Sequence, residues 1–379
     1  MRILVLGDVC VVGELEALAL AKPEFSICAE IRARIDVDLV VANIEFALTT
    51  EERPLPGKWA TLRADPKVVS ALDGIDIGVI ANNHVGDFGE QGARDTASVL
   101  LDAGIRPVGW GESFARAIEP VVIGQGERKL AIVALSCLTT NGGNYATQDS
   151  AGVALLSRET VVEAVKRAKE AASSVLVYLH WGVEQSSYPV FDQMGLARGA
   201  VQAGADAVVG THAHVIQGWE LYRDSPIFYG IGNLAFPDVP CSWYSDDGSK
   251  QVGVVRQRRV NQESIGIVLE HTSTGQLRVA EVVTFRFELG EAKCSLMAVG
   301  ESVVQVAKVN ATIANVAKRW SSELDGFGEQ SLRIRCGFNG VCAEYVRRTI
   351  DCDGALSRSY AVHRELGSWI QRLCRRKWN

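Results

Sequence analysis

Short runs of apolar and β-branched residues recur along the chain, and they constrain its fold more than any other feature. They lie at residues 3–6, 39–42, 75–80, 130–135, 175–179 and 207–209. Strands that are apolar on both faces are typical of a sheet covered by helices. Helix-like segments at residues 91–103, 158–172 and 191–203 lie between some of these runs. The alternation predicts an α/β layered fold.

The character of the sequence changes after residue 226. Residues 227–231 are expected to form another strand, and residues 265–271 and 277–287 a β-hairpin. The polar stretch 238–262 is expected to be a long loop, which in a compact domain is often a lid. Amphipathic stretches at 301–320, 342–350 and 357–374 look helical. We therefore expect a catalytic domain over residues 1–290 and a helical C-terminal extension over residues 291–379 that packs on it.

The amino-acid composition restricts the classes of partner and the cellular location that we expect for this chain. The net charge is −6 and aromatic residues make up 7% of the chain, which argues against a nucleic-acid partner. We find no apolar run long enough to span a membrane, and the N-terminus resembles a first core strand more than a signal peptide. Nine cysteines without CxxC spacing are typical of reduced thiols. We expect a cytoplasmic protein with no membrane partner.

Polar side chains capable of chemistry stand just past the ends of five predicted strands. In open α/β sheets, such strand ends meet at one edge and build the site. The residues are Asp8 after the first strand, Asn43 and Glu45 after the second, Asn82, Asn83 and His84 after the third, then His180, and finally His212 and His214.

This mixture of imidazole, carboxylate and amide groups is what a divalent metal site needs. The spacing of His212 and His214 would place both side chains on one side of an extended segment. A single histidine after a strand is more often satisfied by a backbone hydrogen bond than by a metal. Four of the six histidines lie at such strand ends, however, and this favours a metal site.

The motifs GD, N-x-E, ANNH-x-x-D-x-G, HWG-x-E, GTHAHVIQG and Y-x-IGNLAF occur in this order over about residues 1–240. Together they resemble the CapA family of capsular polyglutamate synthesis, which is similar in fold to calcineurin-like metallophosphoesterases. The resemblance implies an α/β sandwich of two mixed β-sheets flanked by helices. It does not cover the C-terminal region.

The resemblance also implies a set of metal ligands. One metal position would be built by Glu45, Asn83, His180 and His212. The other would use Asp8, the residue two further on, Glu45 and His214. In the phosphoesterases that residue is a histidine, whereas here it is Cys10. We therefore expect one well-held divalent ion, and the sequence does not distinguish Ca²⁺, Mg²⁺, Mn²⁺ and Zn²⁺.

Roles in proton transfer follow from the same resemblance. His84 matches the general acid of the phosphoesterases. Asp87 either orients the His84 imidazole or caps the helix that starts near Glu90, and the two roles are equally weighted. Asp8 and His214 lack the histidine ligand that Cys10 replaces, and they would form a second acid/base pair instead.

Two reactions fit this site. The preferred hypothesis is implied by the same resemblance, because soluble members of the family include peptide epimerases. It is a metal-dependent peptide epimerase that inverts a Cα, from L to D, at the C-terminal residue of a ribosomal precursor peptide such as a lasso precursor. The peptide would then be the partner. The alternatives are a metallophosphoesterase and an accessory protein of capsule or polyglutamate synthesis. A degenerate scaffold with a structural ion is a third, non-enzymatic possibility.

Overall fold

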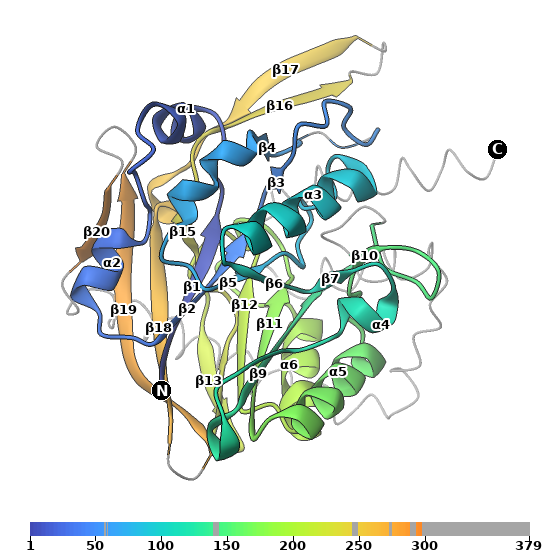
Figure 1. Ribbon diagram of the computed structural model, residues 1–379, viewed down its shortest axis with the longest axis vertical. Helices are drawn as coiled ribbons and strands as arrows, with labels where there is room; N and C mark the ends of the chain where they lie inside the picture. The colour runs from blue at the N-terminus through green and yellow to red at the C-terminus, as the bar shows by residue number, and fades with distance from the viewer. Residues whose placement is uncertain are drawn as a thin grey trace, which may run out of the picture. The chain divides into compact units, whose positions relative to one another are not determined.

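The computed structural model describes residues 1–297, except for 57, 59, 139–143, 245–248, 273–274 and 289–292 (Figure 1). The helices predicted beyond residue 300 lie outside the described residues. Residues 293–297, the described part of the predicted helical extension, form a strand instead, β20 (Lys293–Met297). The proposed division at residue 290 stays a prediction.

The larger sheet has eight strands, and its centre is parallel. Strands β1 (Arg2–Val9), β2 (Leu39–Ile44), β5 (Ile77–Val79) and β6 (Arg106–Val108) run parallel, and β15 (Asn233–Ala235) pairs in parallel with the end of β1. An antiparallel wing follows on the other side of β1, made of β18 (Glu263–His271), β19 (Leu277–Glu288) and β20. The predicted C-terminal hairpin is confirmed.

The second sheet has six strands and is also mixed. Strands β9 (Leu130–Ser136), β11 (Ser174–His180), β12 (Ala207–Thr211) and β14 (Ser225–Phe228) run parallel. Strands β8 (Val121–Ile123) and β13 (Trp219–Tyr222) close the edges in the antiparallel direction. The α/β fold with two mixed sheets agrees with the expected sandwich.

Alternation along β1 shows how the layers are formed. Ile3 and Val5 belong to a buried cluster between the two sheets, which also contains Tyr178 of β11. Leu4 and Leu6 belong to a second cluster on the opposite face of the larger sheet. Because successive side chains of a strand point to opposite faces, a fully apolar strand contributes to both cores.

Helices cover the outer faces of the sheets. Helices α1 (Glu14–Ala21), α2 (Ala29–Arg34) and α3 (Gly89–Asp102), with the 3₁₀-helix η1 (Pro66–Leu72), contribute to the core on the larger sheet. Helices α5 (Arg158–Ala171) and α6 (Phe191–Ala203) lie over the second sheet (Figure 1). The predictions of α3, α5 and α6 are thus confirmed. A short helix, α4 (Phe114–Ala117), and two 3₁₀-turns, η2 (Gly126–Arg128) and η3 (Arg259–Asn261), lie in connections.

Three small pairs of strands complete the described fold. They are β3 (Ala47–Leu48) with β4 (Arg63–Ala64), β7 (Trp110–Gly111) with β10 (Gly152–Val153), and β16 (Val239–Tyr244) with β17 (Lys250–Val255). The last pair corrects the loop expected over 238–262, because most of that stretch is a hairpin that extends at the top of Figure 1. In the described part of the chain, no helix is both long and apolar enough to cross a membrane.

Candidate metal centre

The candidate site lies where β1, β2, β11 and β12 end. Asp8 is in β1, Glu45 directly follows β2, and His180 is the last residue of β11. All three side chains are fully buried. Asn83, His212 and His214 come from the turns after β5 and β12 and are also buried. The strand ends of both sheets therefore meet at one site, as the sequence predicted. Asp8 and Asn43, however, stand inside β1 and β2 and not past their ends.

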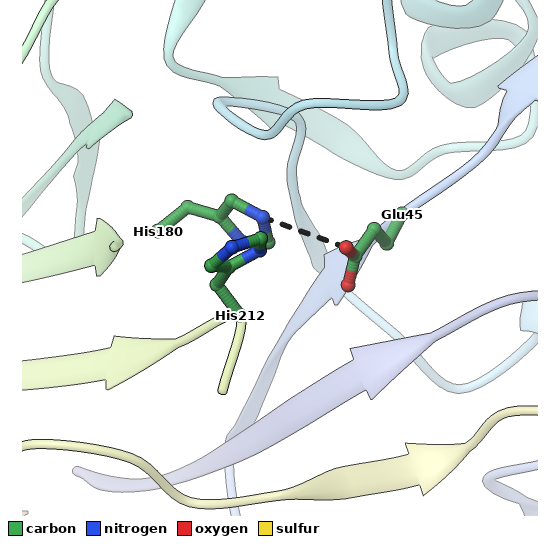
Figure 2. Close-up of side chains that lie close together, drawn as sticks. All are labelled: Glu45, His180 and His212. Atoms are coloured by element: carbon green, nitrogen blue, oxygen red, sulfur yellow. Dashed lines mark ion pairs between the residues drawn. The ribbon is translucent and has the colours of Figure 1, made fainter. Parts of the chain in front are cut away.

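The first expected set of ligands comes together closely. His180 Nε2 lies 2.8 Å from Asn83 Oδ1 and 3.5 Å from Glu45 Oε1. The rings of His180 and His212 have centroids 4.6 Å apart. Figure 2 shows the two imidazole rings next to each other, across from the Glu45 carboxylate. The dashed line in it marks the His180–Glu45 ion pair. Glu45, His180 and His212 form one compact group of potential metal donors.

Two buried atoms show that these residues fit a cation. Glu45 Oε1 and His212 Nδ1 have no hydrogen-bond partner among the residues that the structure describes. A buried polar atom without a partner is costly, and a cation bound by Glu45 would satisfy its Oε1. Donor atoms about 2.1 Å from one ion, at right angles to each other, lie about 3 Å apart. The distances around His180 Nε2 are close to this spacing.

A second group of donors shares one of these ligands. Asp8, Glu45 and His214 also form a compact group, so Glu45 belongs to both. His214 Nδ1 lies 3.4 Å from Asp8 Oδ2, and His214 Nε2 lies 3.8 Å from Glu45 Oε1. Cys10 is buried but belongs to none of the groups found among the described residues. A further group joins Glu184 to His212 and His214 at the rim.

A layer of asparagines fixes the carboxylates and the turn after β5. Asn43 Nδ2 donates to Asp8 Oδ1 at 2.8 Å and lies 3.4 Å from Glu45 Oε2. Asn82 Nδ2 donates to Asn43 Oδ1, and Asn82 Oδ1 accepts from the backbone N–H groups of His84 and Val85. These bonds connect β2 to the turn that carries Asn83 and His84. Partners of this kind orient metal ligands in proteins.

His84 and Asp87 form a hydrogen-bonded pair beside the ligands. His84 Nδ1 lies 2.7 Å from Asp87 Oδ2, which also accepts from Leu62 N. Helix α3 begins with Phe88 at its N-cap and has no side-chain cap. Of the two roles left open for Asp87, the geometry therefore supports orientation of His84. Because Nδ1 is the nitrogen bonded to Asp87, Nε2 is left for proton exchange.

Two residues at the site were not predicted from the sequence. Lys58 Nζ contacts both Asp87 Oδ1 and the carbonyl oxygen of Asn83. Asn233 Oδ1 lies 2.8 Å from His214 Nδ1. Asn233 stands in the Y-x-IGNLAF motif, so its position in that motif was the available signal. Lys58 lies in a polar segment with no motif of its own.

The reason given for the spacing of His212 and His214 was wrong. Strand β12 ends at Thr211, and both histidines have left-handed backbones, with φ of 83° and 55°. Such angles are uncommon outside glycine and cost about 1–3 kcal/mol each, so they persist where the surroundings enforce them. Asp8 Oδ2 accepts from His212 N, and Asn261 Nδ2 donates to His214 O, which holds this turn in place.

The buried charges shift the pKa values in opposite directions. Burial lowers the pKa of His180 and of His212, and neighbouring histidines lower both further. Burial, followed by the charge of Asp8, raises the pKa of Glu45. Burial lowers the pKa of His214, but Glu45 and Asp8 outweigh it and raise that pKa to about 10. Two neutral imidazoles and a clustered pair of carboxylates are suited to bind a divalent cation.

The fold and this centre define an α/β protein of two mixed sheets with a buried His/Glu/Asp cluster that can bind a metal ion. The family model described as bacterial capsule synthesis protein PGA_cap matches residues 2–238, more than half of the chain. The chain belongs to this family, as its motifs indicated.

Curated relatives match a similar part of the chain. It is 30% identical over 208 residues to the capsule biosynthesis protein CapA of Bacillus anthracis, and 32% identical over 203 residues to the PGA biosynthesis protein CapA of Bacillus subtilis. Each match covers 52% of this chain, and 50% and 53% of the relatives, respectively. The matched region thus spans about half the length of these relatives.

Solved structures give more distant matches. A phosphatase from Mycoplasma pneumoniae has a TM-score of 0.40 and 14% identity, covering 78% of this chain and 90% of its own. The NAD nucleotidase of Haemophilus influenzae has a TM-score of 0.43 and 12% identity, covering 86% and 67%, respectively. Matches with such low TM-scores and sequence identities carry no information about the reaction of this chain.

Proposed function

We propose that this chain is a metal-dependent enzyme that serves the synthesis of a glutamate polymer or a related peptide, and that it exchanges the proton on a substrate Cα. Family membership and the names of the curated relatives support the polymer, and they favour capsule or polyglutamate synthesis over a ribosomal precursor peptide. The proton exchange is supported by the site itself.

The observation that carries the proposal is the presence of two imidazole–carboxylate pairs beside one four-donor set. His84 is bonded to Asp87, and His214 lies 3.4 Å from Asp8. Inversion of a Cα needs one group that removes the proton and another that returns a proton on the opposite face. The two imidazoles supply these groups from two separate turns, after β5 and after β12.

Each residue of the first pair has a distinct task. As the Cα–H bond breaks, the proton moves to His84 Nε2 and the electron pair moves toward the neighbouring carbonyl oxygen. Asp87 stabilises the imidazolium that forms, while Lys58 balances the charge of Asp87. His214 then delivers a proton to the opposite face of the Cα, which inverts its configuration. The same steps in reverse restore the original configuration.

The cation, when held by Glu45, Asn83, His180 and His212, supplies positive charge near the carbonyl oxygen as a Lewis acid. The chain itself contributes the buried surroundings in which such charges act strongly.

Isotope exchange tests the proposal. The Mn²⁺-loaded protein is incubated in D₂O with a γ-linked glutamate oligomer and, separately, with acetylated hexapeptides that vary in their last residue. We expect deuterium at one Cα, together with D-residues after hydrolysis. His84→Ala should lower the rate by about 10²–10⁴-fold while the metal content stays unchanged, because His84 is not a ligand in this account. Absence of exchange in every substrate would overturn the proposal.

Phosphoester hydrolysis is a second candidate, favoured by one observation. The donor groups share Glu45, as a bridging ligand would be shared in a two-metal site. This reaction needs the Asp8, Glu45 and His214 group to be filled, whereas proton exchange by His214 needs it to be empty. Elemental analysis that finds two tightly bound ions per chain, with turnover of an aryl phosphate, would establish the second candidate instead.

A further inference from the structure

A basic segment ends beside the site. Residues 250–260 contain one lysine and three arginines and no acidic residue. They form β17 of the exposed hairpin and continue into η3. Asn261, the last residue of η3, is buried and donates to the carbonyl oxygen of His214. The basic segment is therefore attached to the turn that carries two of the candidate ligands.

The three arginines of this segment differ in their partners. Arg256 lies 3.5 Å from Asp238, and Arg259 lies 3.6 Å from Glu263. Arg258 has no carboxylate within ion-pair distance among the described residues. Its Nη2 donates to the neutral Oε1 of Gln185 at 2.5 Å. Arg258 is thus an exposed guanidinium that is held in place by an amide and whose charge is not balanced.

Gln185 holds this guanidinium close to the GTHAH turn of the site. Its backbone N–H donates to the carbonyl oxygen of Ala213, between the two histidines of the GTHAH turn. Its Oε1 accepts from Asn261 as well as from Arg258. Its neighbour Glu184 belongs to a donor group with His212 and His214. The Arg258 guanidinium is therefore three hydrogen bonds away from the carbonyl oxygen of His214, through Gln185 and Asn261.

The negative charge of the site indicates a role for Arg258 in binding. Four carboxylates, from Asp8, Glu45, Asp87 and Glu184, lie in or beside the donor groups. An anionic substrate that approaches them needs a cation at the entrance. Lys58 is already paired with Asp87, whereas the planar guanidinium of Arg258 has donors left for a carboxylate.

We propose that Arg258 binds a carboxylate of the substrate at the mouth of the site and so selects acidic chains. This inference rests on the proposed function for the identity of the substrate. It does not depend on the reaction, because it concerns binding.

The test measures binding of two matched probes to the Mn²⁺-loaded protein by fluorescence anisotropy. One probe is a fluorescein-labelled γ-linked glutamate tetramer, and the other is the same tetramer with its carboxylates converted to amides. Wild-type protein should bind the acidic probe at least about tenfold more tightly, since the guanidinium forms a charge-assisted hydrogen bond with a carboxylate but not with an amide. Arg258→Ala should abolish this preference, and Arg258→Lys should retain part of it.

Arg256→Ala and Arg259→Ala are the matched controls and should keep the preference, because these arginines already face carboxylates. The inference is overturned if wild-type protein shows no preference, if Arg258→Ala keeps it, or if Arg258→Ala weakens both probes equally, as a purely structural role would. Failure of Cα exchange with an intact binding preference would overturn the proposed reaction and leave this inference standing.

Discussion

At the scale of single residues, the site is organised by how its charges compensate one another. Glu45 and Asp8 are buried together, and His214 supplies the nearest compensating charge in the absence of a metal. His180 and His212 are kept neutral by burial and are ready to act as ligands. A divalent cation in the first donor set would take over the compensating role of His214.

Metal binding should therefore release protons in a pH-dependent way. The pKa of His214 is raised to about 10 in the metal-free protein, so at pH 8 the folded state holds a proton that the ordinary pKa would not retain. Binding of Mn²⁺ next to Glu45 lowers this pKa, and the fraction of His214 that stays protonated supplies the proton that the exchange delivers. We expect less than one proton released per ion at pH 8, and less still as the pH rises above about 10. Calorimetry in two buffers of different ionisation enthalpy measures the number of protons released per bound ion. Release that does not change over this range would contradict the assignment.

Lys58 gives a second prediction at this scale. Removal of its charge leaves the buried Asp87 without its cation and loosens the orientation of His84. Lys58→Met should lower the rate of Cα exchange by about 10- to 100-fold, the usual effect of losing a partner that orients a functional group. Lys67→Met, an exposed lysine in η1, is the matched control and should react like the wild type. Equal rates of Cα exchange in the two variants would show that Lys58 does not help to orient His84.

At the scale of elements, the placement of Asp8 depends on the close contact of β1 and β15. A Cβ at Gly7 would lie 1.8 Å from the carbonyl oxygen of Gly232, the oxygen that accepts from Asp8 N. Only glycine allows this approach without a backbone shift. The same contact aligns Asp8 with Asn233, the partner of His214.

Gly7→Ala should therefore destabilise the fold by about 1–3 kcal/mol, the usual range for overpacking. It should also weaken metal binding, because β15 must move away from β1. Gly195→Ala in α6 is the control, since a Cβ there meets no atom within 4 Å. It should stabilise the protein by about 0.5–1 kcal/mol. Denaturant unfolding measures both changes, and a neutral Gly7→Ala would show that the contact is not tight.

The sequence predicted those elements whose signals are local. Apolar runs and amphipathic periods predicted the parallel strands β1, β2, β5, β9, β11, β12 and β14 and helices α3, α5 and α6, because these patterns lie within each segment. The parallel strands β6 and β15, of three residues each, were not predicted. The hairpin of β16 and β17 was missed because its stretch is polar, and Val252 and Val254 are exposed rather than part of a core. The turn at His212 and His214 was misjudged because left-handed angles are imposed by contacts with distant residues.

At the scale of the whole described unit, the candidate ligands join the two sheets. Glu45 and Asn83 come from the larger sheet, and His180 and His212 from the second. The rule that strand ends converge was enough to predict this meeting point. Lys58 and Arg258 were not predicted, because each reaches the site through a tertiary contact that no local pattern reveals. Asn233 was missed although it stands in the Y-x-IGNLAF motif.

A ligand that joins two sheets should stabilise their common fold. At a free metal concentration of 100 times the dissociation constant, Mn²⁺ should raise the free energy of unfolding by about 2.7 kcal/mol. His180→Ala should lose most of this increment. His271→Gln, at a buried histidine bonded to Ser174 instead, should keep it even if its starting stability is lower. Thermal unfolding with metal and with chelator measures the increment, and the same increment in His180→Ala would place the ion elsewhere.

The most direct test is the anomalous difference density of a crystal soaked in Mn²⁺. The account predicts one strong peak about 2–2.3 Å from ligand atoms of Glu45, Asn83, His180 and His212. The absence of any peak among these four side chains, or a peak bound by other residues alone, would contradict it.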